Sequence, residues 1–227
     1  MTALVLIFLL SSANNRECAL KANFSLTTVI TERKTTTNVV KGNIYVLEGP
    51  VVLFEVSSPV SQLMWIKQDT VDIYYPEEKK LFRIISRDTL PTRNTSVSHM
   101  FNLDFEHQLH AAGFKVTKSE NKGDTLLLHW NNPEVRASTE IVTGSIGENF
   151  VLYRTSGRGW SLEVKLWDYR NIDGKRYPHL MRSKFKKGKL TRIEELRLKE
   201  VEVDVALPSY LADFKIPKDA EVKIVEW

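Results

Sequence analysis

The sequence predicts a mainly β protein of the α+β class, built as one large antiparallel sheet with few helices. Short apolar runs between Lys41 and Arg87 are separated by turn residues, as a meander of hairpins requires. The strand pattern returns between Phe114 and Trp227, with no repeat and no clear domain boundary. A chain of 227 residues, 42% of them hydrophobic, is long enough to bury a substantial core in one domain.

The N-terminal residues have the features of a secretory signal peptide. The apolar run from Thr2 to Leu10 is too short to span a bilayer, and small residues at 11–13 suit a cleavage site. We expect cleavage between residues 13 and 22, which leaves residues 23–227 as a single domain. The alternative is an N-terminal strand or helix of the mature fold. Cys18 is the single cysteine, so no intrachain disulfide can form, and the charged residues before it argue against a lipid anchor.

The first half of the chain predicts a strand meander followed by a helix. Residues 23–37 fit either an early strand or a helix, and the meander then runs from Val39 to Ser86. A helix is expected over residues 96–112, because Met100, Phe101, Phe105 and Leu109 recur at helical spacing and Gly113 can end it. Its single apolar stripe predicts that this helix packs onto the sheet.

The second half of the sequence predicts further strands, each with one solvent-exposed face. Residues 161–167 alternate cleanly between apolar and charged side chains, and Val201, Val203 and Val205 alternate with acids. Residues 171–174 and 187–189 have the composition of hairpin turns. Residues 134–143 fit either a helix or a strand.

The meander strands carry more apolar side chains than one buried face would ordinarily need. Such a sheet either curves around an apolar cavity or packs as a closed sandwich, and the sequence leaves both forms open. A cavity would accept acyl chains, at about 0.8 kcal/mol for each methylene removed from water. In the curved form the candidate lining residues are Val52, Phe54, Val56, Met64 (or Leu63), Trp65 (or Ile66), Ile73, Tyr75, Met100, Phe101, Phe105 and Leu109.

Positive charge is concentrated in one segment. The net charge is +4, but residues 175–199 hold ten Lys or Arg against two Glu, so the rest of the chain is net negative. Such a block can bind an anionic membrane surface, here through Lys184, Lys186 and Lys187. Because these residues alternate with apolar ones along strands, a solvated sheet face is the favoured interpretation.

Catalytic and metal-binding motifs are missing from the sequence. There is no Gly-x-Ser-x-Gly elbow, no His-Glu-x-x-His, no cysteine cluster and no phosphate-binding glycine loop. His107 and His110 are three residues apart on the expected helix, near His99 and Glu106, and could in principle bind a metal, but histidines on a polar helix face are more often solvated. We therefore expect neither an enzyme, nor a metal or other cofactor, nor a nucleic acid partner.

Several short motifs resemble the LolA-like family of outer-membrane lipoprotein carriers and sorting proteins. In the first half these are residues 42–46, Pro50, Phe54, Ser58-Pro59, Gln62 and above all Val71-Asp72-Ile73-Tyr74-Tyr75-Pro76. The C-terminal part of the chain resembles the same family. The matching residues there are Asp168, Gly174, Tyr177-Pro178, the strand from Leu190, Leu207-Pro208 and Phe214-Lys215-Ile216-Pro217. The resemblance covers about residues 24–225.

The resemblance implies an unclosed antiparallel half-barrel with lid helices over a concave apolar face. It also implies a periplasmic protein that holds the acyl chains of a lipoprotein or lipid and exchanges them with membrane-bound donor and acceptor proteins. Handoff would then require movement of the helix expected over residues 96–112. The family often has a basic residue before the proline of the first hairpin, whereas Glu48 and Gly49 precede Pro50 here, so no such role is transferred.

Because the basic residue before Pro50 is missing, the resemblance does not identify the cargo. It could be a lipoprotein, a glycolipid as in LppX-like relatives, or another amphiphile. An alternative function is an envelope sensor or regulatory binding module, as in RseB-like relatives with the same half-barrel.

Overall fold

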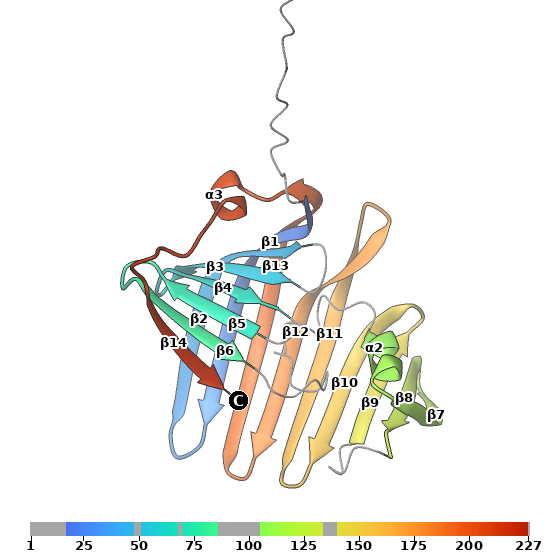
Figure 1. The fold of residues 1–227 in the computed structure, drawn as a ribbon. Helices are drawn as coiled ribbons and strands as arrows, with labels where there is room; N and C mark the ends of the chain where they lie inside the picture. The colour runs from blue at the N-terminus through green and yellow to red at the C-terminus, as the bar shows by residue number, and fades with distance from the viewer. Residues whose placement is uncertain (1–16, 48–50, 68–69, 86–104, 134–139, 227) are drawn as a thin grey trace, which may run out of the picture.

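The computed structural model describes residues 17–47, 51–67, 70–85, 105–133 and 140–226. Within them the chain forms one sheet of fourteen strands, in the order β14-β6-β5-β4-β3-β2-β1-β13-β12-β11-β10-β9-β8-β7. Neighbouring strands are antiparallel, except that β14 runs parallel to β6. The sheet curves strongly without closing, because its first and last strands are not paired (Figure 1). The prediction of one large, mainly antiparallel sheet is confirmed.

The first six strands form one antiparallel series, and the later ones form a second. The first six are β1 (Glu17–Thr31), β2 (Thr35–Leu47), β3 (Val52–Ser58), β4 (Gln62–Ile66), β5 (Thr70–Tyr75) and β6 (Lys80–Ile85), and the predicted meander corresponds to β2 through β6. The later strands are β7 (Lys115–Lys122), β8 (Thr125–Asn131), β9 (Glu140–Ile146), β10 (Asn149–Gly157), β11 (Trp160–Ile172), β12 (Lys175–Lys187), β13 (Leu190–Ala206) and β14 (Glu221–Glu226).

Two short helices occur among the described residues, α2 (Phe105–Ala111) and α3 (Ser209–Ala212). The helix α2 is the described end of the helix expected over residues 96–112, while residues 96–104 lie outside the described part of the chain. As predicted, Gly113 ends it: its φ is 81°, and the following amide of Phe114 donates to the carbonyl of Leu109 at 2.9 Å.

Both ambiguous segments contain strand. Residues 23–37 fall in β1 and the start of β2, where the threonine-rich part forms an exposed two-stranded ribbon. In the segment 134–143 the described residues begin β9, and residues 134–139 lie outside the description. The hairpin turns predicted at 171–174 and 187–189 are confirmed between β11 and β12 and between β12 and β13.

Because side chains alternate along a strand, the sheet has two faces with separate cores. We call the face that carries Phe54 the inner face and the face that carries Leu53 the outer face. The inner core is large and draws on most strands, including the buried residues Leu20, Phe24, Ile44, Phe54, Ile141, Tyr153, Val164, Met181 and Leu196. A smaller outer core contains Cys18, Tyr45, Leu53, Leu207 and Leu211.

The inner face is concave where β1, β2 and β3 meet. Phe24 and Phe54 lie on strands separated by β2, yet their ring centroids are only 5.1 Å apart in an edge-to-face contact. Strands two apart in a flat sheet are separated by roughly 9.5 Å, so these side chains converge. Gly42 of β2 is in register with Phe24 and carries no side chain that would keep the two strands apart.

Residues 207–220, here called the C-terminal strap, connect β13 to β14 (Figure 1). The strap packs against the outer face. Leu207 and Leu211 are buried in the outer core. Farther along, Asp219 accepts a charged hydrogen bond from Lys79 at 2.6 Å, and the amide of Glu221 donates to the carbonyl of Lys79 at 2.8 Å. The strap therefore covers part of the outer face of the sheet.

Candidate functional site

The inner face is large and mainly apolar, and some of its apolar side chains stay partly exposed. Its buried floor is extended by apolar side chains that stay partly exposed. These half-buried residues include Leu26, Val40, Val46, Met64, Val71, Leu128, Phe150, Trp160 and Phe185. A concave, partly open apolar surface of this kind can take up the apolar part of another molecule.

Most of the predicted lining residues that can be placed lie on this face. Val52, Phe54 and Val56 of β3 are buried in the inner core, and Met64 of β4 packs against it. Ile73 shares the face because it pairs directly with Met64. Two residues along β5 from Ile73, Tyr75 lies on the same side, and its ring meets that of Phe82 edge to face at 5.8 Å.

Trp65 lies on the opposite face, and the prediction that groups it with Met64 is wrong on this point. Consecutive residues of a strand point to opposite sides, so Met64 and Trp65 cannot share one. Trp65 packs on the outer core, stacked against Phe214 of the strap with ring centroids 5.2 Å apart and planes inclined by 21°.

The helix α2 lies over one end of the inner face, beside β8 and β9. Its Leu109 is fully buried in the inner core. Two consecutive hydrogen bonds hold the helix in place. Trp130 Nε1 donates to Thr143 Oγ1 at 2.9 Å, and Thr143 Oγ1 donates to Glu106 Oε1 at 3.3 Å. Met100, Phe101 and the side chain of Phe105 lie outside the described part of the structure.

A pocket of about 520 Å³ lies on the other side of the sheet, between the outer face and the strap. Its apolar walls come from both. They consist of Leu47, Val51, Leu53, Trp65, Leu207, Leu211, Phe214 and Ile216. The remaining lining residues are Lys67, Asp72 and Arg83, so the pocket also has a charged part.

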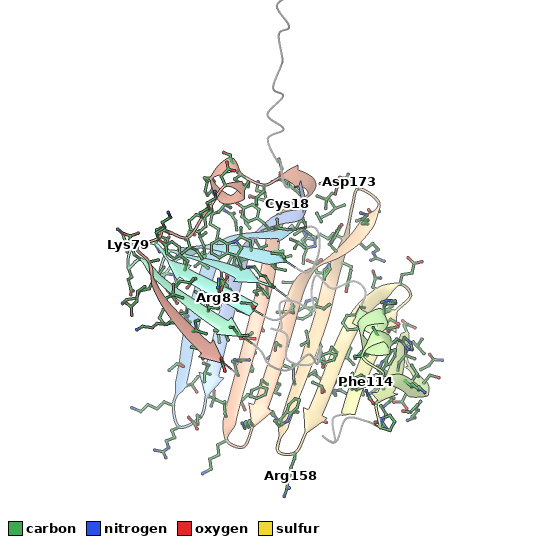
Figure 2. All side chains as sticks on the ribbon, viewed as in Figure 1. Cys18, Lys79, Arg83, Phe114, Arg158 and Asp173 are labelled. Atoms are coloured by element: carbon green, nitrogen blue, oxygen red, sulfur yellow. The ribbon has the colours of Figure 1, made fainter. Side chains whose placement is uncertain are left out.

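The charged part of the pocket is an ion-pair network centred on a buried carboxylate. Asp72 is 3% exposed and lies opposite Arg83 in the pairing of β5 with β6. Arg83 donates from Nε to Oδ1 at 2.7 Å and from Nη2 to Oδ2 at 3.0 Å, while Lys67 Nζ lies 3.5 Å from Oδ2. Figure 2 labels Arg83 among the strands of the meander.

Burial and charge act in opposite directions on Asp72. Burial tends to raise the pKa of its carboxyl group, but the hydrogen bonds and charge of Arg83, with a smaller contribution from Lys67, outweigh it. The net pKa is therefore lowered. The carboxylate stays ionised and fixes the orientation of the Arg83 guanidinium.

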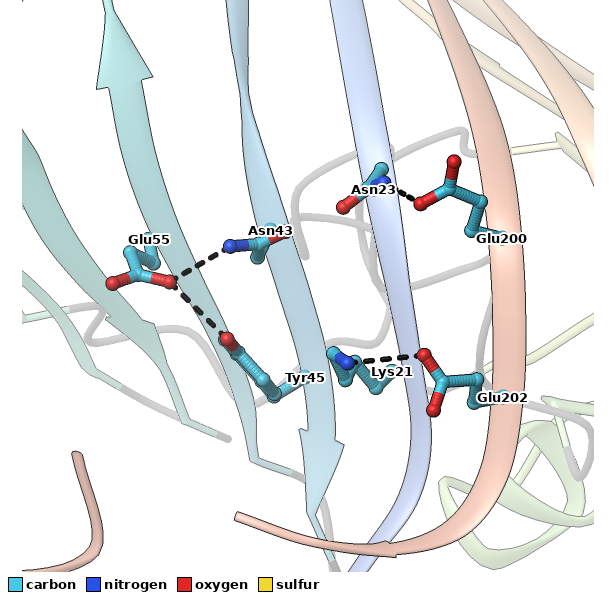
Figure 3. Close-up of polar contacts among 7 residues, drawn as sticks. All are labelled: Lys21, Asn23, Asn43, Tyr45, Glu55, Glu200 and Glu202. Carbon is cyan, nitrogen blue, oxygen red and sulfur yellow. Dashed lines mark hydrogen bonds and ion pairs between the residues drawn. The ribbon is translucent and has the colours of Figure 1, made fainter. Parts of the chain in front are cut away.

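Polar side chains on the outer face join strands β1, β2, β3 and β13 (Figure 3). Glu55 accepts hydrogen bonds from Asn43 at 2.9 Å and from Tyr45 at 3.1 Å. Glu202 accepts one from Lys21 at 3.0 Å, and Glu200 accepts another from Asn23. Tyr210 of the strap donates to the second carboxylate oxygen of Glu55 at 2.6 Å, so this cluster also fastens α3 to the sheet.

Three neighbouring hairpins bring basic residues to one end of the sheet. Register places their turns side by side, because Thr31 pairs with Thr191 and Lys187 pairs with both Leu190 and Trp160. We call the exposed cations at these turns the basic rim: Arg33, Lys34, Arg158, Lys187 and Lys189. Figure 2 shows Arg158 at this end and Asp173 at the other.

The predicted basic residues divide between this rim and the adjoining sheet. Lys184 and Lys186 are exposed on the face opposite Phe185, which confirms that they lie on the solvent side of a strand. Lys187 belongs to the rim. Sequence inspection missed Arg33, Lys34 and Arg158, because only the sheet order brings their hairpins beside that of Lys187.

The outer pocket was also missed, although the sequence holds a signal for it. Asp72 interrupts the apolar run of β5 and Arg83 that of β6, and charged residues in mid-strand commonly have a partner. The spacing alone does not show that the two are in register.

The described residues include neither a membrane-spanning helix nor a metal-binding cluster. None of the described helices is long and apolar enough to cross a membrane. No group of three His, Cys, Asp or Glu side chains in the described ranges is placed to hold a metal ion.

Solved structures with a similar architecture include a LolA superfamily protein and a DUF1329 family protein. The chain resembles a LolA superfamily protein of Nitrosomonas europaea with a TM-score of 0.58 at 12% sequence identity, over 91% of this chain and 92% of the other. It resembles a DUF1329 family protein of Desulfovibrio piger with a TM-score of 0.52 at 15% identity, over 85% and 89% of the two chains.

A third similar structure is a domain classed with outer membrane lipoprotein-sorting proteins, from Vibrio parahaemolyticus. Its TM-score is 0.52 at 13% identity, over 86% of this chain and 88% of that domain. Comparison with family models and with curated proteins gave no match. These similarities establish the fold: the chain has the LolA-like half-barrel architecture that its motifs suggested.

Proposed function

We propose that this protein is a periplasmic carrier that holds the acyl chains of a lipoprotein or lipid against its inner face and moves them between membranes. The supporting observation is the row of half-buried apolar side chains on that concave face. The fold shared with a lipoprotein-sorting domain supports the same function.

The energetics favour such a cargo. Each methylene that leaves water for the inner face gains about 0.8 kcal/mol, so an acyl chain gains enough in total to offset the loss of its mobility. An amphiphile with several chains cannot cross an aqueous space at useful concentration without such cover.

The basic rim provides a surface with which a carrier could meet a membrane. It adjoins the inner face where Trp160 and Phe185 stack with ring centroids 6.5 Å apart. Half-buried aromatic rings beside exposed cations suit the headgroup region of an anionic bilayer. Cargo would then pass over this end of the sheet.

Two neighbouring residues of β2 allow a direct test of cargo binding. Val40 packs on the inner core, whereas Val39 is 41% exposed on the other side of the strand. With a fluorescent diacylated lipopeptide, the wild type and Val39→Glu should bind alike. Val40→Glu should bind at least tenfold more weakly, since it places a charge among the cargo chains.

Thermal unfolding of both variants checks that each is folded, and Val40→Trp supplies an uncharged variant that obstructs the same surface. Organic extraction of the protein purified from an envelope fraction should also release acylated material. Failure of the wild type to bind the lipopeptide, together with an empty extract, would overturn the proposal.

A further inference from the structure

We infer that the outer pocket beneath the C-terminal strap is a second ligand site, which takes a single-chain amphiphile with an anionic head group. This inference does not depend on the proposed carrier function, because the pocket lies on the opposite face of the sheet. A molecule on the inner face would be separated from it by the paired backbones of β3, β4 and β5.

The size and walls of the pocket suit one hydrocarbon chain. Its volume of about 520 Å³ falls within the range of pockets that bind small molecules, roughly 300–1,000 Å³. Trp65 and Phe214, stacked at 5.2 Å, provide a flat aromatic wall, and Leu211 of α3 lines the pocket as well. An alkyl chain beside these side chains gains free energy in proportion to the apolar surface that it removes from water.

The charged part of the pocket selects the head group. Lys67 and Arg83 carry two positive charges and Asp72 one negative charge, so the lining has an excess of one positive charge. The side chains of Lys67 and Arg83 are 48% and 39% exposed, whereas that of Asp72 is 4% exposed. A ligand therefore meets the cations and not the carboxylate.

Arg83 has hydrogen-bonding capacity left for a ligand. Its contacts with Asp72 use Nε and Nη2, and a guanidinium carries five N–H donors in total. Because Asp72 holds the guanidinium from one side, its remaining donors are preorganised for an oxygen anion. A carboxylate and a phosphate monoester share this chemistry.

The strap makes the pocket a built site and not a surface depression. Leu207 and Leu211 are buried in the outer core, and Tyr210 is hydrogen bonded to Glu55. The walls contributed by the strap are therefore held in place by contacts outside the pocket itself.

The test is calorimetric titration of the full-length protein with oleate, with oleyl phosphate and with oleyl alcohol, each below its aggregation concentration. Oleate or oleyl phosphate should bind with one molecule per chain, and whichever binds more tightly identifies the head group. Oleyl alcohol should bind at least tenfold more weakly, since it has the same chain without the charge.

Variants locate the binding. Lys67→Glu reverses the excess charge at an exposed position and should weaken anion binding at least tenfold, while Lys184→Glu, at an exposed position on β12, should not change it. Leu211→Trp should fill the pocket and abolish binding. Val40→Glu, which obstructs the inner face, should leave it unchanged, so failure of this site and failure of the carrier function can be told apart.

The inference is overturned if none of the three amphiphiles binds the wild type, if the alcohol binds as tightly as the anions, or if Lys67→Glu binds as the wild type does. Loss of binding in Val40→Glu would assign the amphiphile to the inner face and would equally overturn it.

Discussion

A side chain on Gly42 would collide with the backbone of Glu55. A Cβ built there would lie 1.9 Å from the Glu55 carbonyl oxygen and 2.9 Å from the Cα of Val56. This close approach occurs at a register shift between β2 and β3, where the sheet bends so that Phe24 and Phe54 meet. The curvature of the inner face therefore depends on the absence of one Cβ.

Replacement of Gly42 by alanine should destabilise the protein by about 3 kcal/mol, because the backbone of β3 must move to admit the methyl group. Urea unfolding measures the loss. Gly123→Asn is the matched control: Gly123 has a φ of 62° that asparagine tolerates, and nothing lies within 4 Å of its added Cβ. Equal stability of Gly42→Ala and the wild type would contradict this explanation of the bend.

The ion pair of Asp72 with Arg83 should make stability depend on acid pH. Because the pKa of Asp72 is lowered in the fold, the unfolded chain takes up the proton first as the pH falls. Its contribution is complete above the ordinary pKa of 3.8 and is lost as the pH falls through the lower value of the folded state. Asp72→Asn should remove this part of the acid sensitivity, whereas the exposed Asp173→Asn should keep it.

Removing only one partner of that pair should cost more than removing both. Arg83→Met leaves a carboxylate that is 3% exposed without its bidentate donor, at a cost of about 3 kcal/mol or more. Asp72→Asn combined with Arg83→Met should cost less in urea unfolding than Arg83→Met alone, and so less than the sum of the single changes. Additive losses would show that the two residues act independently.

Phe214 should anchor the strap. Its ring lies 5.2 Å from that of Trp65 and 5.6 Å from that of Tyr74, so Phe214→Ala should loosen residues 207–216 and expose Trp65 to water. We expect faster amide exchange in that segment and a red shift of tryptophan emission. Tyr210→Phe, which removes the hydroxyl that donates to Glu55 and keeps the ring, should have a smaller effect of under about 1 kcal/mol. Unchanged exchange in Phe214→Ala would exclude the anchoring role.

If a signal peptide is removed, the structure favours cleavage before Glu17. Cys18, Leu20 and Ala22 are buried in β1, which pairs with β2 on one side and β13 on the other. Cleavage after Ala22 would delete these contacts from the centre of the sheet. Intact mass of the exported protein should therefore show a mature N-terminus at or before residue 17, and a chain that begins at residue 23 should be markedly less stable.

The basic rim should govern binding to anionic vesicles. Lys187→Glu combined with Lys189→Glu should reduce co-sedimentation with phosphatidylglycerol vesicles by roughly tenfold for each reversed charge, and added salt should weaken wild-type binding. Lys175→Glu with Arg176→Glu is the matched control, because it changes the hairpin at the other end of the same strand. Equal losses in both pairs would show a diffuse charge effect with no role for the rim.

The meander could be predicted because each of its strands is short, apolar and bounded by turn residues. The assignment of faces within it could not. Met64, Trp65 and Ile66 are all apolar, since the inner core covers one side of β4 and the strap covers part of the other. Without a polar face to mark the alternation, the sequence does not reveal which of these residues point inward.

The remaining features depend on contacts between distant parts of the chain. Asp72 meets Arg83 through the register of β5 with β6, and the strap that completes the pocket follows more than a hundred residues later. The basic rim likewise needs β1 beside β13. No local pattern encodes such pairings, so these sites became visible only in the structure.

The pairing of β1 with β13 also determines when the sheet can be completed. It joins residue 17 to residue 206 and residue 31 to residue 191, so the two central strands come from opposite ends of the chain. Closing so long a loop is slow, and while β13 is missing β1 presents an open hydrogen-bonding edge to other chains. During synthesis the residues of β1 to β6 are therefore made before β13 can pair with β1. Aggregation should be most severe at that stage, and a chaperone that holds β1 until β13 arrives should raise the yield of folded protein.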